Sequence, residues 1–269
     1  MIVGSVFLLS SCAVKKHKDI SYLETATASE NETPKLNVFT PRNTAKKLPV
    51  LIYVHGGYWN SGNKDIYGFF GRNFAKKDVV TVIPSYTLSP NANYEQMTQQ
   101  IAQVIQWTKD SIANYNGDPD QIFVTGHSAG GHLVALATLD KKYGVESNTV
   151  KGIILNDAAG LDMYTYLQNN PPTTEHNYDV TWTKEPATWK DASPMYYLDK
   201  DAPPFLIYLG SKTYPSIINS NERFLEALKP FQPTVEPIVL KKKHVSMITQ
   251  YLWPWNDRFD EIKNFIEQH

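Results

Sequence analysis

The chain alternates short apolar segments with longer segments whose apolar residues recur at helical spacing. The apolar segments read as buried strands, which we predict at residues 36–39, 49–54, 79–83, 121–125, 150–155, 205–209 and 235–240. Helices are predicted over Tyr94–Tyr115 and from Leu133 to Lys142. Strands that alternate with helices favour an α/β fold with a mostly parallel central sheet and helices on both faces.

Length and composition indicate one folded domain. The chain has 269 residues, of which 42% are hydrophobic and 20% charged, with a formal net charge of -1. These values exclude disordered, collagen-like and coiled-coil chains, and they give no electrostatic reason to expect a nucleic acid partner. Residues 161–200 break the alternation and are rich in Pro, Tyr, Trp and Asn, so we predict a small cap insertion there.

A Gly-x-Ser-x-Gly motif follows one predicted strand and precedes a predicted helix. It reads Gly126-His127-Ser128-Ala129-Gly130. Glycines at these places allow a sharp turn that exposes a serine at the carboxyl edge of the sheet. The helix that begins there presents its positive end, and the amide of Ala129 faces the place where an oxyanion would form. The motif predicts Ser128 as a nucleophile; a helix cap is the structural alternative.

A second motif, His55-Gly56-Gly57-Tyr58-Trp59, follows the strand that ends at Val54. Adjacent glycines leave backbone amides unshielded, and such amides can donate hydrogen bonds to a developing negative charge. We therefore predict an oxyanion hole formed by Gly56, Gly57 and Ala129. His55 is expected to hold the loop.

Together these segments resemble the α/β-hydrolase superfamily, in the branch that contains carboxylesterases, feruloyl-esterase-like proteins and kynurenine formamidases. The resemblance rests on the two motifs above and on Tyr86-Thr87-Leu88-Ser89-Pro90, and it extends from Leu36 to the C-terminus. It implies an α/β-hydrolase fold and hydrolysis of an ester or formamide through an acyl-serine.

A serine nucleophile needs a base, which is most often histidine. The chain order of this fold is serine, acid, histidine, so the base should lie late in the sequence. His244 lies in the loop after the last predicted strand and is our predicted base. For His127 and His132, which flank Ser128, structural roles are expected.

The acidic residue that orients the histidine is not at the position where the resemblance leads one to expect it. Relatives usually carry Asp shortly after the glycine that ends the penultimate strand, but Gly210 is followed by a carboxylate-free segment that contains Thr213. An acid from the end of the preceding strand can serve instead if its geometry allows. We predict Asp157; Asp162, Glu222 and a site without any acid remain alternatives.

The main prediction is a serine hydrolase that cleaves small carboxylic esters, either small molecules or glycan-linked esters. A kynurenine formamidase-like amide hydrolase and a noncatalytic binding lipoprotein that retains the fold are the alternatives. No metal-ligand spacing, phosphate loop or dinucleotide motif occurs in the sequence, so neither a metal nor a cofactor is expected. Aromatic residues that can line the substrate cleft are Tyr58, Trp59, Tyr86, Tyr164, Tyr166, Trp182, Trp189, Trp253 and Trp255.

The N-terminus opens with an apolar run that is too short to span a membrane and has the length of a signal peptide. The run ends in Leu9-Ser10-Ser11-Cys12, which resembles the lipobox of bacterial lipoproteins, and Cys12 is the only cysteine. We therefore predict a signal peptide at residues 1–11, a lipid anchor on Cys12 that contacts the bilayer, a tether at 12–34 and the hydrolase domain at 35–269. The expected location is the bacterial cell envelope. An incidental cysteine in a hydrophobic N-terminus is the alternative.

Overall fold

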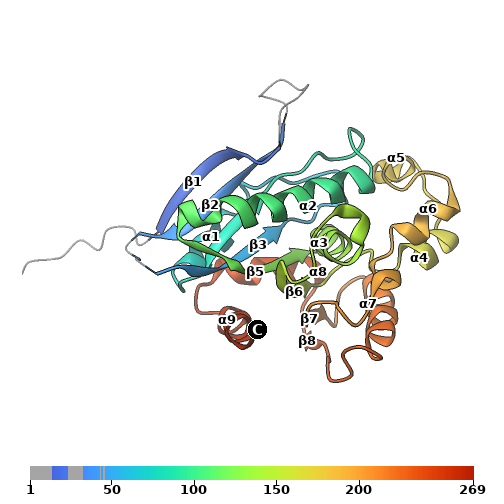
Figure 1. The fold of residues 1–269 in the computed structure, drawn as a ribbon. Helices are drawn as coiled ribbons and strands as arrows, with labels where there is room; N and C mark the ends of the chain where they lie inside the picture. The colour runs from blue at the N-terminus through green and yellow to red at the C-terminus, as the bar shows by residue number, and fades with distance from the viewer. Residues whose placement is uncertain (1–13, 24–32, 43, 45) are drawn as a thin grey trace, which may run out of the picture.

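The computed structural model describes residues 14–23, 33–42, 44 and 46–269 (Figure 1). The expected signal peptide and Cys12 lie outside the described residues. No helix within the described residues is long and apolar enough to cross a membrane.

An eight-stranded mixed sheet forms the centre of the molecule, with the strand order β1-β2-β4-β3-β5-β6-β7-β8 (Figure 1). The strands are β1 (Val14–Ser21), β2 (Lys35–Pro41), β3 (Leu48–Val54), β4 (Val80–Pro84), β5 (Gly117–His127), β6 (Val150–Asn156), β7 (Phe205–Gly210) and β8 (Ile238–Leu240). Strand β2 pairs antiparallel with both of its neighbours, β1 and β4. All the other neighbouring strands, from β4 to β8 in the sheet order, pair parallel. The predicted mostly parallel α/β architecture is confirmed.

Helices cover both faces of this sheet. They are α1 (Gly68–Ala75), α2 (Tyr94–Ser111), α3 (Ala129–Leu139), α4 (Met163–Asn169), α5 (Tyr178–Thr181), α6 (Pro186–Asp191), α7 (Pro215–Leu228), α8 (His244–Thr249) and α9 (Arg258–Gln268). Short 3₁₀ helices are η1 (Ile112–Tyr115), η2 (Lys141–Tyr143), η3 (Glu175–Asn177), η4 (Pro194–Tyr197) and η5 (Gln250–Leu252).

Alternate strand residues separate two hydrophobic cores. On β3, Val50 and Ile52 pack with α2, α3 and α7, whereas Leu51 and Tyr53 pack with α1, α8 and α9. This follows from the two-residue period of a strand, which sends successive side chains to opposite faces. Burial on both faces explains why the strand segments read as continuous apolar runs.

The first described strand differs from the expected tether. Residues 14–21 form β1, which pairs antiparallel with β2 at the edge of the sheet. The strand was not predicted because it is rich in lysine and has no apolar run. An edge strand needs only backbone pairing and tolerates charged side chains. Lys16 forms an ion pair with Asp65 at 3.0 Å, and the ring of His17 meets Tyr115 edge-on at 4.8 Å.

The predicted insertion forms a small cap from α4, η3, α5, α6 and η4. Figure 1 shows α4, α5 and α6 together at one end of the molecule, close to α7. Trp182 of the cap is fully buried and packs edge-on against Trp59 at a ring separation of 4.7 Å. This contact ties the cap to the loop that follows β3.

Candidate active site

Four chain segments deliver the predicted side chains to one edge of the sheet. Ser128 directly follows β5, Asp157 follows β6, Thr213 lies three residues beyond β7, and His244 begins α8 after β8. Strands β5 to β8 are parallel neighbours, so their carboxyl ends meet at the same edge.

Ser128 lies on a sharp turn between β5 and α3, with φ 55° and ψ -123°. A side chain at Gly126 would come within 2.2 Å of the backbone of Gly130, and one at Gly130 within 2.1 Å of the carbonyl oxygen of Val54. Only glycine fits where backbones approach this closely. The two glycines of the motif therefore make the turn possible.

A chain of hydrogen bonds joins the three predicted residues. Nε2 of His244 lies 2.9 Å from Oγ of Ser128, and Nδ1 of His244 lies 2.6 Å from Oδ2 of Asp157. Because the carboxylate accepts the proton on Nδ1, Nε2 is left with a lone pair that faces the serine hydroxyl. This is the arrangement in which an imidazole can accept the serine proton.

Asp157 is fully buried and held by donors on both carboxylate oxygens. The amide of Gly210 donates to Oδ1 at 2.8 Å, and the hydroxyl of Thr213 donates to Oδ2 at 2.5 Å. These hydrogen bonds replace the water that an ionised carboxylate loses on burial.

The other two candidate acids have different surroundings. Asp162 accepts the amide of Thr165 at 3.0 Å, caps α4 and forms an ion pair with Nε of Arg223. Glu222 is exposed on α7. Of the three candidates, the structure brings Asp157 to His244.

In the sequence, Thr213 stands out only because it has no charge at the position where relatives carry the acid. In the structure its hydroxyl lies 3.3 Å from Nδ1 of His244 and also bonds Asp157. The signal was available, because a hydroxyl at the position where relatives carry the acid can still reach the acid supplied by the neighbouring strand.

The predicted oxyanion residues lie beside Ser128. A Cβ at Gly56 would come 2.9 Å from Cβ of Ser128, and Gly57 has φ +130°, a conformation that favours glycine. Within the described part of the chain, the amides of Gly56, Gly57 and Ala129 donate to no protein acceptor. Ala129 also begins α3, whose amino end carries partial positive charge.

His55 holds the loop that contains Gly56 and Gly57. Its Nδ1 donates to the carbonyl of Gly56 at 2.9 Å, and the carbonyl of His55 accepts from the hydroxyl of Tyr86 at 3.0 Å. Its ring stacks on Tyr86 with a centroid separation of 4.6 Å. Burial lowers the pKa of His55 to about 4, so the imidazole is neutral at pH 7.

The two histidines that flank Ser128 have structural contacts. His127 donates through Nε2 to the carbonyl of His244 at 3.1 Å, and burial lowers the pKa of His127 to about 3. His132 accepts from Nε1 of Trp59 at 3.2 Å and donates to the carbonyl of Ala192 at 2.8 Å. His132 thus links the oxyanion loop to the cap.

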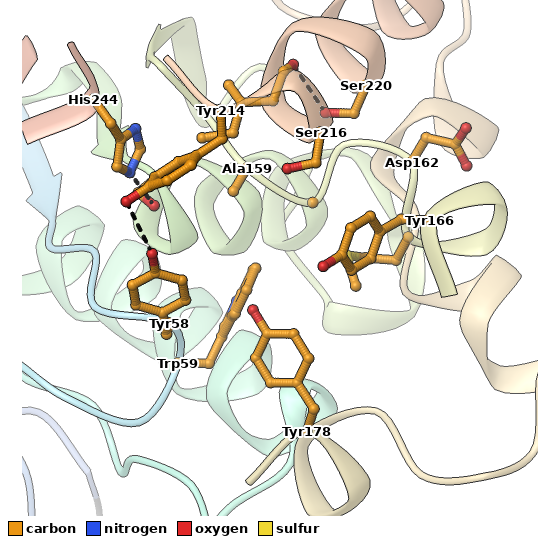
Figure 2. Close-up of a pocket in the computed structure, with 14 residues that line it drawn as sticks. Tyr58, Trp59, Ala159, Asp162, Tyr166, Tyr178, Tyr214, Ser216, Ser220 and His244 are labelled. Carbon is orange, nitrogen blue, oxygen red and sulfur yellow. Dashed lines mark hydrogen bonds between the residues drawn. The ribbon is translucent and has the colours of Figure 1, made fainter. Parts of the chain in front are cut away.

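A cavity of about 190 Å³ opens beside Ser128 and His244 (Figure 2). Its lining consists of Tyr58, Trp59, Ser128, Ala159, Gly160, Asp162, Met163, Tyr166, Tyr178, Tyr214, Ser216, Ile217, Ser220 and His244. The hydroxyl of Tyr58 donates to that of Tyr214 at 3.2 Å beside His244, as Figure 2 shows.

Of the aromatic residues named from the sequence, Tyr58, Trp59 and Tyr166 line this cavity. The others have different positions: Tyr86, Trp182 and Trp189 are buried in the core, Tyr164 packs against it, and Trp253 and Trp255 are exposed.

The sequence between β2 and the middle of α7 decides the family. A family model described as BD-FAE matches residues 36–222, which include both motifs and Asp157. The chain belongs to the BD-FAE family.

The BD-FAE chain is 26% identical over 232 residues to esterase LipC of Mycobacterium tuberculosis, covering 81% of this chain and 58% of LipC. It is 34% identical over 206 residues to kynurenine formamidase of Salmo salar, covering 74% of this chain and 66% of that protein. The chain spans about half the length of the first curated relatives, with 46% of LipQ and 47% of LipM covered.

Solved structures agree on the fold. An inhibited esterase B from Lactobacillus rhamnosis superposes on the BD-FAE chain with a TM-score of 0.76 and 20% identity, covering 95% of this chain and 87% of that one. This likeness confirms the α/β-hydrolase fold.

Among the described residues of this BD-FAE member, His127, Asp157 and His244 place potential metal-ligand atoms within 4.8 Å of one another. Hydrogen bonds account for this proximity. His244 Nδ1 already bonds Asp157, and Nε2 of His127 already bonds the carbonyl of His244. The cluster is therefore explained as a hydrogen-bonded site.

The buried histidines predict how stability depends on pH. Burial lowers the pKa of His55 and His132 to about 4 and that of His127 to about 3. In the unfolded BD-FAE chain a histidine pKa is about 6.5, so below that pH the unfolded state binds protons that the folded state does not. The contribution of these histidines to the free energy of unfolding is fully present above about pH 6.5. As the pH falls toward 4, that contribution decreases by about 1.4 kcal/mol per histidine per pH unit.

Urea unfolding at pH 7.5, 6.5, 5.5 and 5.0 measures this loss. In His132→Gln, the free energy of unfolding should fall less steeply as the pH decreases, because one buried histidine is gone. A free energy of unfolding that stays constant from pH 7 to pH 5 would contradict neutral burial of these rings.

Proposed function

We propose that this protein hydrolyses small carboxylic esters through an acyl intermediate on Ser128. The observation that carries the proposal is the hydrogen-bonded chain from Ser128 through His244 to the buried Asp157, beside a cavity. Such a chain supplies a nucleophile, a base and a group that orients the base.

In the first half of the reaction, Oγ of Ser128 attacks the ester carbonyl carbon while Nε2 of His244 takes the hydroxyl proton. The carbonyl oxygen gains negative charge, which the amides of Gly56, Gly57 and Ala129 would stabilise. When the bond to the alcohol oxygen breaks, His244 returns the proton to that oxygen. Water then attacks the acyl-serine by the same route, and the carboxylic acid leaves.

Asp157 accepts the Nδ1 proton throughout, so it fixes the tautomer of His244 and stabilises the cation formed during attack. Gly210 and Thr213 hold the carboxylate in place.

The cavity supports a small substrate. Its volume of about 190 Å³ is modestly larger than a cavity of roughly 150 Å³, which holds a benzene molecule. A short acyl or alkyl group fits such a space, whether it comes from a small molecule or from a glycan-linked ester.

Hydrolysis of an aryl formamide is the second candidate, favoured by the 34% identity to kynurenine formamidase. The same residues would serve it, because a formamide carbonyl also passes through an oxyanion. The third hypothesis, a noncatalytic binding lipoprotein, gives no role to the hydrogen bonds that join Ser128, His244 and Asp157.

Initial rates on p-nitrophenyl acetate, butyrate and octanoate, a feruloyl ester and N-formylkynurenine separate these candidates. We expect short acyl esters to be the best substrates by kcat/KM. A preference for the formamide supports the second candidate, and absence of hydrolysis of every substrate supports the third.

Thr213 provides a prediction about the acid. Thr213→Val removes the hydroxyl that donates to Asp157 with little change in volume, so we expect kcat to fall about tenfold with little change in KM. Thr213→Ser restores a hydroxyl and should restore most of kcat. Steady-state kinetics of both variants test this, and an unchanged kcat in Thr213→Val would contradict it.

We also propose that Cys12 carries a lipid and anchors the protein in the bacterial cell envelope. The lipobox-like run supports this, and β1 begins only two residues later, at Val14. The anchor would then hold the domain close to the bilayer. Radiolabelled palmitate should label the protein in bacterial cells and should not label Cys12→Ser; label retained in that variant would refute the proposal.

A further inference from the structure

A second cavity, of about 470 Å³, adjoins the one beside Ser128. It is lined by Thr165, Tyr166, Asn169, Asn170, Ser216, Asn219 and Arg223. Tyr166 and Ser216 line both cavities, so the two spaces are neighbours that share these side chains. Figure 2 shows both residues at the edge of the first cavity, away from His244.

Helices α4 and α7 form the walls of the second cavity. Ser216, Asn219 and Arg223 follow one another at intervals of three and four residues, which places them on one face of α7. Tyr166 and Asn169 are three residues apart on α4, so they also share a face. The lining is therefore a property of two regular elements.

Arg223 is the only charged side chain among the described residues that line this second cavity. Its Nε donates to the carboxylate of Asp162, which is itself buried. A guanidinium has five N–H donors, so this contact leaves the donors of the two terminal nitrogens. Among the described residues, the hydrogen bond that the structure shows for the Arg223 guanidinium is the one from Nε, and the side chain is 38% exposed. Asp162 thus fixes one edge of the guanidinium and leaves the other free.

Apart from the ring of Tyr166, the remaining lining side chains carry hydroxyl or amide groups. The side-chain nitrogens of Asn169 and Asn170 donate to backbone carbonyls of α4, at 2.8 Å and 3.0 Å. Ser216 and Asn219 are exposed. A hydrocarbon group would gain little in this space, whereas a polar group can be bonded there.

We propose that the second cavity is a subsite for a carboxylate carried by the substrate, at the far end of the group that occupies the first cavity. The two terminal nitrogens of Arg223 would bind the two carboxylate oxygens, a geometry that guanidinium and carboxylate share. The proposal rests on the proposed ester hydrolysis and adds a substrate class to it: esters that also carry a free carboxylate.

Two matched ester series test the subsite. In the first, the carboxylate is on the acid side: p-nitrophenyl hemiesters of succinate, glutarate, adipate and suberate, each compared with the unbranched alkanoate of equal chain length. In the second, it is on the alcohol side: acetyl esters of ω-hydroxy acids, compared with their methyl esters. We expect kcat/KM to favour the carboxylate form about tenfold in at least one series, at the chain length that reaches Arg223.

Three variants identify the source of that preference. Arg223→Gln should abolish it. Because that change leaves Asp162 buried without its partner, Asn219→Asp is a second test: it alters an exposed residue and should reverse the preference by charge repulsion. Lys229→Gln is the matched control, since it removes one positive charge from an exposed residue just beyond α7, away from the cavity lining, and should leave the preference unchanged.

The outcomes are distinguishable. Hydrolysis of the neutral esters without any carboxylate preference would overturn the subsite and leave the proposed function intact. A preference that survives both Arg223→Gln and Asn219→Asp would also overturn it. Failure to hydrolyse any ester would instead count against the proposed function.

Discussion

Ser128→Ala should lower kcat for a short acyl ester by roughly 10³- to 10⁶-fold, because it removes the hydroxyl that faces Nε2 of His244. His244→Ala should cost about as much, since Ser128 then lacks the base 2.9 Å away. The double variant should lose little more than either single one, because the two side chains act as a unit. Hydrolysis of p-nitrophenyl butyrate by purified variants measures all three.

Ser147→Ala is the control, since Ser147 is exposed and does not line the cavity beside Ser128. Its kcat should equal that of the wild type. Near-normal activity in purified Ser128→Ala would end the acyl-serine hypothesis, and fully additive losses in the double variant would contradict joint action.

Asp157→Asn has the second largest expected effect, a loss of roughly 10²- to 10⁴-fold in kcat. The Asp157 carboxylate accepts hydrogen bonds from His244, Thr213 and Gly210, and an amide has only one acceptor oxygen. If the NH₂ group of Asn faces His244, it favours the wrong tautomer of that ring; if it faces the amide of Gly210, two N–H donors oppose each other. The side-chain amide also cannot stabilise the imidazolium.

Asp162→Asn is the matched comparison, because it changes another buried aspartate of the same region. It should weaken the contact with Arg223 and leave kcat for neutral esters within about tenfold of the wild type. Circular dichroism and thermal unfolding of both variants separate loss of fold from loss of chemistry. Equal losses of kcat in folded Asp157→Asn and Asp162→Asn would contradict the assignment of Asp157.

Local chemistry made the centre of the site predictable. The glycines around Ser128 and after His55 have a steric purpose that can be argued from sequence, and the chain order of the fold directs attention to His244. Asp157 could be preferred because it directly follows an apolar strand, and the structure places its carboxylate 2.6 Å from the ring of His244.

Other features depend on contacts that sequence patterns do not show. Residues 14–21 contain lysines and no strong alternation, yet they pair with β2, because pairing at an edge depends on the backbone. The bond between Thr213 and Asp157 was not predicted, because it joins residues at the ends of different strands, and its one sequence signal was a hydroxyl at the position where relatives carry the acid. The cavity at Arg223 needs the relative placement of α4 and α7, which neither helix determines alone.

The most direct test of the account is covalent capture of the nucleophile. The purified protein is treated with a fluorophosphonate, which phosphonylates activated serines, and the labelled peptide is located by mass spectrometry. We expect one label, on Ser128, that forms in the wild type, is lost in Ser128→Ala and forms much more slowly in His244→Ala. A label on another serine, or an unlabelled protein that still hydrolyses esters, would contradict it.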